Sequence, residues 1–358
     1  MMFKKMFNLV IEYIFRRKSY ASMLLTSGVS LILGSLQGLA FILKFLLNDI
    51  VPIINEIEID YGETYIYSFL VGLILIVISI CWECRNNKIE RNKPKFGLYQ
   101  KYLTNSLERD FKETINKKAG SNVTVTEIDI SQFVENSILI EPEKSLKKIN
   151  NKISAYIENV YGANNYAELY YGGLMAVPFT FYTGMELDDR YPITVFDYDR
   201  NNEKWKEIKE IVNPDFAPNI YIENNGNNSG DSIISIGVSY PINEDEIQSN
   251  FPDYPISKIA IEPININNHW DITFQKELQS KFFELAQKLA ASGTKTIHLI
   301  LAAQNSVSFN LGRCYDNRNL PEIIVYQYEK GNEIKYPWGV KMKTSGLQGA
   351  EIITIPAH

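Results

Sequence analysis

The sequence has few of the side chains on which catalytic and disulfide-bonded proteins depend. Its 358 residues include three cysteines and three histidines. Three cysteines form no disulfide framework, and the C-x-x-C pair of Cys81 and Cys84 has no second pair and no nearby histidine to complete a zinc site. We interpret these thiols as incidental. The chain also has no G-x-S-x-G turn, Walker loop or metal-spaced cluster, so we predict that it is not an enzyme and holds no cofactor or metal.

The three histidines do not change this prediction. His298 lies inside an apolar run, where a core imidazole is the simpler interpretation, His269 has no identifiable partner, and His358 is the terminal residue. The acidic runs at 188–189 and 244–246 are typical of solvated turns. A ring nuclease or another phosphodiesterase stays open as an alternative, although no residue pattern supports it.

A positive net charge is also missing. The formal net charge is −6 at pH 7. This excludes a broad surface that coats nucleic acid, because such surfaces need clustered Lys and Arg. We therefore expect no direct binding of DNA or RNA duplexes.

Charge is nearly absent from two long apolar segments. Residues 21–47 carry one charged side chain, Lys44, and residues 65–82 carry none. About 20 apolar residues in a helix span a hydrocarbon core of ~30 Å. The pattern predicts two transmembrane helices, at about 21–47 and 65–82, in a membrane region over 20–84. Neither segment has Asp, Glu or Arg at its centre, which argues against an ion-coupled transporter.

Basic residues flank both segments, and acidic residues fill the loop between them. Lys and Arg occur at 4, 5, 16, 17 and 18 and again at 85, 88, 91, 93 and 95, whereas the loop has five carboxylates and no basic residue. The positive-inside rule therefore places both termini in the cytoplasm. Residues 1–19, with Phe3, Phe7, Val10 and Ile14 on one face, predict an interfacial amphipathic helix that contacts anionic membrane lipid.

The first apolar segment contains the G-x-x-x-G pattern at Gly34 and Gly38. This spacing lets two helix backbones approach closely. It is consistent with self-association of the chain and equally with packing of the two spans against each other. The residues alone do not decide between these two interpretations.

Residues 85–119 are polar and helix-prone, and we predict a juxtamembrane connector there. From 120 to 358 strand-like and helical patterns alternate, which is typical of an α/β domain with largely parallel sheets. Two stretches share one order of features: an apolar run, a turn, Phe-x-x-Gly, and a second apolar run that ends in aromatic-x-Tyr-acid. The Phe-x-x-Gly units begin at Phe181 and Phe309, 128 residues apart. This repeat predicts two similar halves, at about 120–268 and 269–358, related by a pseudo-two-fold axis.

The turn before each Phe-x-x-Gly unit is the predicted ligand site. Ligands of open α/β sheets bind at the carboxyl ends of the strands, where helix N-termini favour anions. Two facing turns would form one composite pocket for a ligand with internal symmetry and several phosphates. The predicted ligand-binding residues are Pro178, Phe179, Thr180, Gln304, Asn305 and Ser306 in the two turns, Arg313 and Lys204 as charge partners, and Tyr198 and Trp205 as rings that stack on bases.

The chain resembles the SAVED family, whose members are fusions of two CARF-like (Rossmann-like) units that sense cyclic oligonucleotides. The resemblance covers about residues 120–358. It is carried by "LMAVPFTFYTG" with "VFDYDRNNEKW" in the first half, and by "IHLILAAQNSVSFNLGR" with "PEIIVYQYE" in the second. Family members commonly have Pro where this chain has Gln304.

A SAVED domain behind two spans resembles the membrane effectors of CBASS antiphage systems. The resemblance implies a protein of the bacterial inner membrane that binds a cyclic oligonucleotide, with a cyclic trinucleotide as the expected ligand. It further implies that ligand binding drives formation of a homo-oligomer and disruption of the membrane, so that growth stops or the cell dies. The remaining alternative is a membrane-anchored, nucleotide-sensing adaptor whose spans only tether it.

Overall fold

The computed structural model describes residues 20–33, 63–102, 108–163, 167–211, 218–224, 230–342 and 349–356. The chain divides into two compact units, Met1–Lys93 and Pro94–His358. The predicted interfacial helix over 1–19 lies outside the described residues, as do Gly34 and Gly38. These predictions therefore stay predictions.

The first unit contains two apolar helices, α2 (Tyr20–Leu33) and α4 (Glu63–Arg91). Within the described residues, one helix is long and apolar enough to cross a membrane, over Tyr67–Ile89. The predicted second span lies inside α4, which continues through the basic flank as far as Arg91. Helix α2 covers 14 residues at the start of the predicted first span, and the remainder of that span lies outside the described residues.

Two glycines bring α2 and α4 together. A Cβ atom on Gly28 would lie 2.7 Å from the carbonyl oxygen of Gly72, and one on Gly72 would lie 2.8 Å from that of Gly28. Further along the helices, Ser79 Oγ donates to the Ala21 carbonyl at 2.6 Å. The pairing of Ala21 with Ser79 and of Gly28 with Gly72 shows that the helices run antiparallel. The described contact between them thus depends on a glycine pair other than Gly34 and Gly38.

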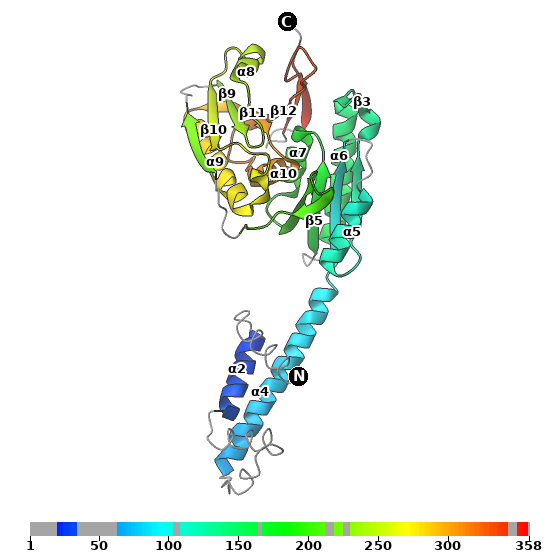
Figure 1. Ribbon diagram of the computed structural model, residues 1–358, viewed down its shortest axis with the longest axis vertical. Helices are drawn as coiled ribbons and strands as arrows, with labels where there is room; N and C mark the ends of the chain where they lie inside the picture. The colour runs from blue at the N-terminus through cyan, green and yellow to red at the C-terminus, as the bar shows by residue number, and fades with distance from the viewer. Residues whose placement is uncertain are drawn as a thin grey trace. The chain divides into compact units, whose positions relative to one another are not determined.

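The second unit contains two large sheets (Figure 1). The spatial order of the five-stranded sheet is β2 (Thr124–Asp129), β1 (Lys95–Lys101), β5 (Glu168–Leu174), β6 (Ile193–Asp199) and β7 (Lys204–Glu207). That of the seven-stranded sheet is β14 (Glu351–Thr354), β13 (Trp338–Lys341), β12 (Glu322–Gln327), β11 (Thr294–Ala302), β9 (Gly230–Gly237), β10 (Ile256–Glu262) and β8 (Asn219–Asn224). Parallel pairing joins β2, β1, β5 and β6, and it joins β12, β11, β9 and β10.

Both sheets are wound in the same way. The helices of the first half are α5 (Glu108–Ala119), α6 (Pro142–Gly162) and α7 (Val177–Leu187), and those of the second are α8 (Glu244–Asn250), α9 (Ile272–Ala291) and α10 (Asn305–Cys314). Each half runs strand, helix, strand, helix, strand, helix, strand and then an antiparallel strand, so that β2-β1-β5-β6-β7 corresponds to β10-β9-β11-β12-β13. The register agrees, because Tyr171 pairs with Val195 and Leu299, its counterpart, pairs with Val325. The predicted α/β class and the repeat are confirmed.

Two predicted boundaries were wrong. Residues 85–119 are not a connector, because Lys95–Lys101 form β1, which pairs with β2 on one side and β5 on the other. The halves also do not divide at 268, because β8, β9 and β10 all belong to the second sheet. The sequence repeat covered only the last strand-helix-strand unit of each half, so the preceding unit of the second half was assigned to the first.

Hydrophobic periodicity explains the long helices of this unit. In α6 the buried residues Leu146, Ile149, Ile153 and Val160 recur at helical spacing. Helix α9 buries Leu278, Phe282, Leu285 and Leu289 in the same way. It begins at Asp271, whose carboxylate accepts from Thr273 N at 2.9 Å and so satisfies one of the free N–H groups of the first turn.

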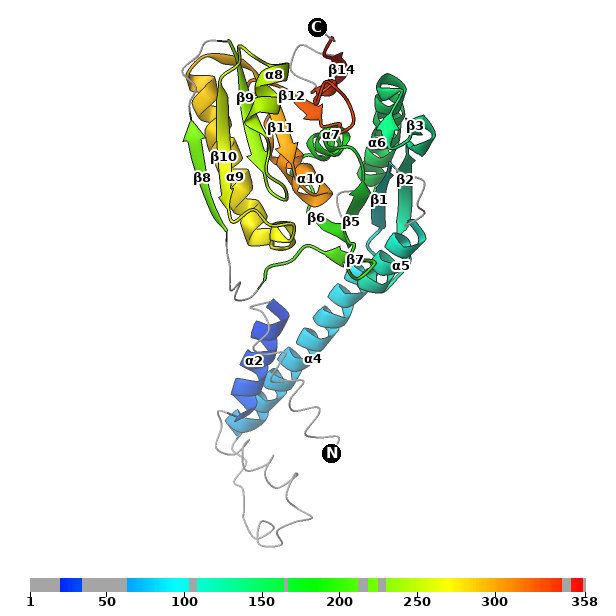
Figure 2. The ribbon, with the colours of Figure 1, turned by 45° about the horizontal axis from the view of Figure 1, so that its top comes forward.

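Helices α7 and α10 lie between the two sheets (Figure 2). Each belongs to one half by sequence but also packs on the other, α7 against β12 and β13 and α10 against β5 and β6. The outer faces have smaller cores. Phe111 of α5 packs on Tyr99 and Trp205, and Phe251, directly after α8, packs on Tyr326 of the second sheet. The two halves therefore share one central core and have one outer core each.

The repeated Phe-x-x-Gly units meet where α7 and α10 cross. A Cβ atom on Gly184 would lie 2.1 Å from the carbonyl oxygen of Phe309, and one on Gly312 would lie 2.1 Å from that of Phe181. Each glycine thus sits over the backbone of the other half, where only hydrogen fits. Asn305 contacts Thr180 near one end of the pair and Arg313 contacts Asp188 near the other, so both helices begin at the same end of the domain.

We predict that Gly184→Ala and Gly312→Ala each destabilise the second unit. A helix gains ~1 kcal/mol when alanine replaces glycine, but here the methyl group meets backbone, and such overpacking costs ~1–3 kcal/mol or more. Thermal unfolding of the full-length protein in detergent is the measurement. The control is Gly162→Ala at the end of α6, which has nothing within 4 Å of the added atom. Equal melting temperatures for Gly184→Ala and Gly162→Ala would contradict the close crossing.

Candidate ligand-binding site

The carboxyl ends of the parallel strands form one edge of each sheet. The chain runs from β1 outward to β2 and returns to β5 on the other side of β1, and the second half does the same with β9, β10 and β11. Open α/β sheets bind ligands at such switch points. The first residues beyond these strands are Tyr102 and Met175 in the first half and Val238 and Ala303 in the second.

The predicted residues of the first turn are buried inside α7. Pro178, Phe179 and Thr180 have almost no exposed surface. The Thr180 hydroxyl donates to Asn305 Oδ1 at 3.0 Å, across the junction between the halves. These three side chains pack the junction and present no surface to a ligand.

The predicted residues of the second turn also join the halves. Asn305 Oδ1 accepts from the Met175 backbone N–H at 2.9 Å in addition to Thr180. The buried Ser306 donates its N–H to Asp197 Oδ2 at 3.0 Å, and its hydroxyl lies 3.2 Å from Gln275 Nε2. Gln304 is half-buried at the start of α10 and makes no side-chain capping bond. Asn305 Oδ1 and the Ser306 N–H therefore bond to the first half, whereas the Ser306 hydroxyl contacts the second half.

The β6–β7 hairpin holds three of the predicted residues. Trp205 is buried, and its ring lies 5.1 Å from that of Phe111, so it is part of the outer core and has no free face for a base. Tyr198 is half-buried and packs edge-on against Trp205 at 5.5 Å. Lys204 is exposed. Of the three, Lys204 and Tyr198 keep surface that a ligand could reach.

Arg313 lies at the other end of α10, away from the strand carboxyl ends. Its guanidinium donates to the carbonyl oxygens of Asp188 at 2.8 Å and Tyr191 at 2.6 Å. Burial lowers the pKa of Arg313. The Asp188 carbonyl belongs to the C-terminal end of α7, where a cation is favourable. Arg313 thus hydrogen-bonds the C-terminal end of α7 and lies away from the strand carboxyl ends, where a phosphate was expected to bind.

The pseudo-two-fold axis relates Asp197 to Gln327 and Ser306 to Pro178, and these pairs differ in chemistry. Asp197 faces the N-terminus of α10 and accepts the Ser306 N–H. Gln327 lies on the sheet face that packs against α7, the same face as Val325, but proline has no N–H to donate. Gln327 Oε1 is buried and has no hydrogen-bond partner in the described part of the chain. Helix α7 also has no side-chain cap.

Ser239 is a second residue that the sequence did not indicate. It follows β9, its backbone N–H donates to the Ala302 carbonyl at 3.1 Å, and its side chain is 6% exposed. Within the described residues its hydroxyl has no partner. The next residue, Tyr240, is 57% exposed, and Tyr328, which follows Gln327, is 42% exposed. Each unsatisfied polar atom at this edge is thus followed in the chain by an exposed aromatic ring.

Comparison with protein families identifies the two parts of the chain. The description "SMODS-associated and fused to various effectors sensor domain" (SAVED) matches residues 147–342. The SAVED-fused 2TM effector domain matches residues 1–146. The chain belongs to the SAVED family. It joins a SAVED sensor domain to a two-transmembrane effector domain and is membrane-associated. No functionally curated protein matches it.

Solved structures with a similar fold include Cap4 SAVED/CARF-domain receptors. The Acinetobacter baumannii receptor with the cyclic trinucleotide 2′3′3′-cAAA is 14% identical, with a TM-score of 0.45, over 88% of this chain and 76% of that one. The Moraxella osloensis receptor is 12% identical, with a TM-score of 0.42, over 75% of this chain and 55% of that one.

The buried histidines of the SAVED domain have structural partners. His298 Nδ1 lies 2.9 Å from Tyr326 OH, and burial lowers the pKa of His298 to about 4. His269 Nδ1 lies 2.9 Å from the Ile266 carbonyl, and burial lowers the pKa of His269 as well. Among the residues that the structure describes, no group of three or more His, Cys, Asp or Glu side chains could hold a metal ion.

His298 makes the stability of the SAVED domain depend on pH. Its pKa is about 4 in the native state and ~6.5 in the unfolded chain. Between these values the unfolded state binds more protons, so stability falls as the pH is lowered from 6.5 towards 4, by up to ~3 kcal/mol. We predict that His298→Phe makes this slope shallower in urea unfolding at several pH values. Tyr326→Phe, which keeps the imidazole, serves as the control, and an unchanged slope in His298→Phe would contradict the assignment.

Proposed function

We propose that this chain is a ligand-gated membrane effector of a CBASS-type antiviral system. The observation that carries the proposal is the joining of two matches on one chain, an effector domain over 1–146 and a sensor domain over 147–342. A cyclic oligonucleotide binds the SAVED domain, and binding activates the transmembrane part. The chain then acts without catalysis, in the inner membrane, with the SAVED domain in the cytoplasm.

The strand carboxyl edge beside the N-terminus of α7 is the ligand site that we propose. Three features support it. Helix α7 has no side-chain cap, and the positive end of its dipole favours a phosphate, although Pro178 has no N–H and the Phe179 N–H donates to the Ala176 carbonyl at 3.1 Å. Gln327 Oε1 is an unsatisfied acceptor for an N–H of a base. Tyr240 and Tyr328 are exposed rings on which bases can stack. Of the residues predicted from sequence, Gln304, Tyr198 and Lys204 keep enough exposed surface to take part.

The two helix N-termini favour a ligand without two-fold symmetry. Asp197 occupies the N-terminus of α10 with a carboxylate, which repels phosphate. The corresponding position at α7 has the neutral Gln327. A ring with two equivalent halves would meet one favourable and one unfavourable terminus. A cyclic trinucleotide has no such two-fold axis, and it remains our expected ligand.

Ligand binding can act on the membrane part through self-association. A ligand shifts a protein toward an associated state only if it binds that state more tightly. Since α2 and α4 already pack through Gly28 and Gly72, the unit that clusters is a helix pair. In the proposed mechanism, Gly34 and Gly38 supply the close contact between copies, and clustering breaches the bilayer.

The first test measures the binding of cyclic di-, tri- and tetranucleotides to the full-length protein in nanodiscs. The change in melting temperature is the readout. A ligand at 100 times its Kd stabilises the bound state by ~2.7 kcal/mol, which is readily measured. We expect a cyclic trinucleotide to give the largest shift. Gln327→Leu should weaken its binding about tenfold, because an N–H of the ligand loses its acceptor.

The control for this variant is Gln132→Leu, which changes an exposed glutamine that contacts Lys148. Equal affinities of Gln327→Leu and the unaltered protein would remove Gln327 from the site. If no cyclic nucleotide shifts the melting temperature, the sensor role itself is contradicted.

The second test concerns the membrane step. In liposomes that hold a fluorescent dye, we expect ligand-dependent leakage from the full-length protein. Gly34→Leu should bind ligand normally but leak at least about tenfold more slowly, because a bulky side chain prevents close helix contact. Gly34→Ala keeps a small residue and should retain most of the leakage. Full leakage from a correctly inserted Gly34→Leu variant would refute this contact. Leakage after both spans are replaced by an unrelated anchor would show that their sequence is not needed.

A further inference from the structure

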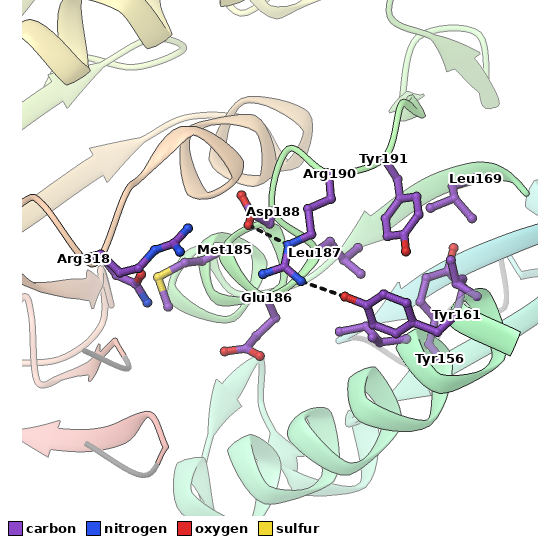
Figure 3. Close-up of a pocket in the computed structure, with 13 residues that line it drawn as sticks. Tyr156, Tyr161, Leu169, Met185, Glu186, Leu187, Asp188, Arg190, Tyr191 and Arg318 are labelled. Atoms are coloured by element: carbon purple, nitrogen blue, oxygen red, sulfur yellow. Dashed lines mark hydrogen bonds and ion pairs between the residues drawn. The ribbon is translucent and has the colours of Figure 1, made fainter. Parts of the chain in front are cut away.

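A cavity of about 430 Å³ lies at the C-terminal end of α7 (Figure 3). It adjoins a second cavity of about 500 Å³ and shares Met185, Asp188, Asn317 and Arg318 with it. Helix α7 starts at the strand carboxyl ends and has 11 residues, so its last turn lies ~16 Å from the ligand edge. Of the ten residues predicted to bind ligand, only Arg313 lines either cavity, and it lines the second. The cavity is therefore separate from the proposed sensor site.

The floor of this cavity is apolar and its wall is aromatic. Val160, Leu169 and Leu187 form part of the floor and are nearly fully buried. The rings of Tyr161 and Tyr191 lie 6.0 Å apart at 71° and line one side. A volume of this size, with an apolar floor and a few converging polar groups, is typical of a small-molecule site. The exposed ring of Tyr161 offers a face on which a planar group can stack.

Two arginines reach the cavity from different halves of the domain. Arg190 follows α7, donates to Tyr161 OH at 2.8 Å and pairs with Asp188 at 3.3 Å, and its side chain is 59% exposed. Arg318 follows α10, is 75% exposed, and has its paired carboxylate, Asp316, at 3.8 Å. Figure 3 shows the two side chains on either side of Met185 and Glu186. Both guanidinium groups line the same cavity, and guanidinium is the side chain best suited to bind a phosphate or carboxylate.

The acidic residues of the cavity limit the charge of its ligand. Asp188 is neutralised by Arg190, but Glu186 also lines the cavity, and the C-terminal end of α7 adds partial negative charge. A ligand with several phosphates would meet this repulsion. A ligand with one anionic group would keep both arginine contacts at a smaller electrostatic cost.

We propose that this cavity is a second ligand site, for a planar ring that carries a single phosphate or carboxylate and has the size of a nucleoside monophosphate. The ring lies against Tyr161 over the apolar floor, and the anionic group bridges Arg190 and Arg318. Because Arg318 belongs to the second half and Tyr161 to the first, the ligand contacts both halves. Its binding therefore stabilises the junction between the halves.

The experiment is titration calorimetry of the full-length protein in nanodiscs with AMP as the probe. We expect saturable binding that Arg318→Ala and Tyr161→Ala each weaken about tenfold. Arg109→Ala, which changes an exposed arginine paired with Glu113 on α5, is the matched control and should leave binding unchanged. Gln327→Leu should also leave it unchanged, which separates this site from the sensor site. Arg318, Tyr161 and Arg109 are at the surface, so we expect the variants at these positions to fold.

Three probes test the chemistry of the ligand. AMP should bind more tightly than ribose 5-phosphate, which lacks the ring, and more tightly than ATP, which carries more charge. If inorganic phosphate binds as tightly as AMP, or if AMP does not saturate at millimolar concentration, the proposal is overturned. The same holds if Arg318→Ala and Arg109→Ala bind AMP equally. None of these outcomes depends on cyclic oligonucleotide binding, so failure of the sensor function would be recognised separately.

Discussion

The carbonyl oxygens of Phe181 and Phe309 lie where a side chain on Gly312 or Gly184 would have to be. This close approach of two backbones holds the SAVED domain together. It lets α7 reach the second sheet and α10 the first, so that the halves share one core. It also brings both helices to start at the same end of the domain. The location of the proposed ligand edge and that of the cavity at the opposite end both follow from this crossing.

The symmetry set up by the crossing is broken at the ligand edge. The first half contributes a carboxylate, Asp197, to the helix of the second. The equivalent position in the second half has an amide, Gln327, whose Nε2 donates to the Tyr328 carbonyl at 3.1 Å. Ser306 donates its N–H to Asp197. Pro178, which is equivalent to Ser306, has no N–H to donate to Gln327. Among the described residues, the N-terminus of α10 donates to a side chain from the other half, whereas that of α7 has no side-chain cap. A duplicated fold can in this way carry a site that is not duplicated.

The sequence predicted the duplication and the edge where the ligand site is proposed, but not which side chains face a ligand there. Phe-x-x-Gly repeats because glycine is required at the crossing, so this signal is local and visible. In contrast, β1 was missed because Lys95–Lys101 are ordinary in sequence, and their burial depends on the two neighbouring strands and on covering elements such as α5. The orientation of Thr180, Asn305 and Ser306 depends on contacts between the halves, which no single turn encodes. Gln327 could have been found, since aligning the repeats places it opposite Asp197.

The order of α4 and β1 has a mechanical consequence. Helix α4 ends at Arg91 and β1 begins at Lys95, and the three residues between them span at most ~10 Å. A force along α4 therefore pulls on the end of a strand that is hydrogen-bonded on both sides. Because β1 is paired on both sides, it can leave the sheet only if the hydrogen bonds of both ladders break. The sensor domain is thus joined to the membrane part through a strand that is held in its sheet by two neighbours.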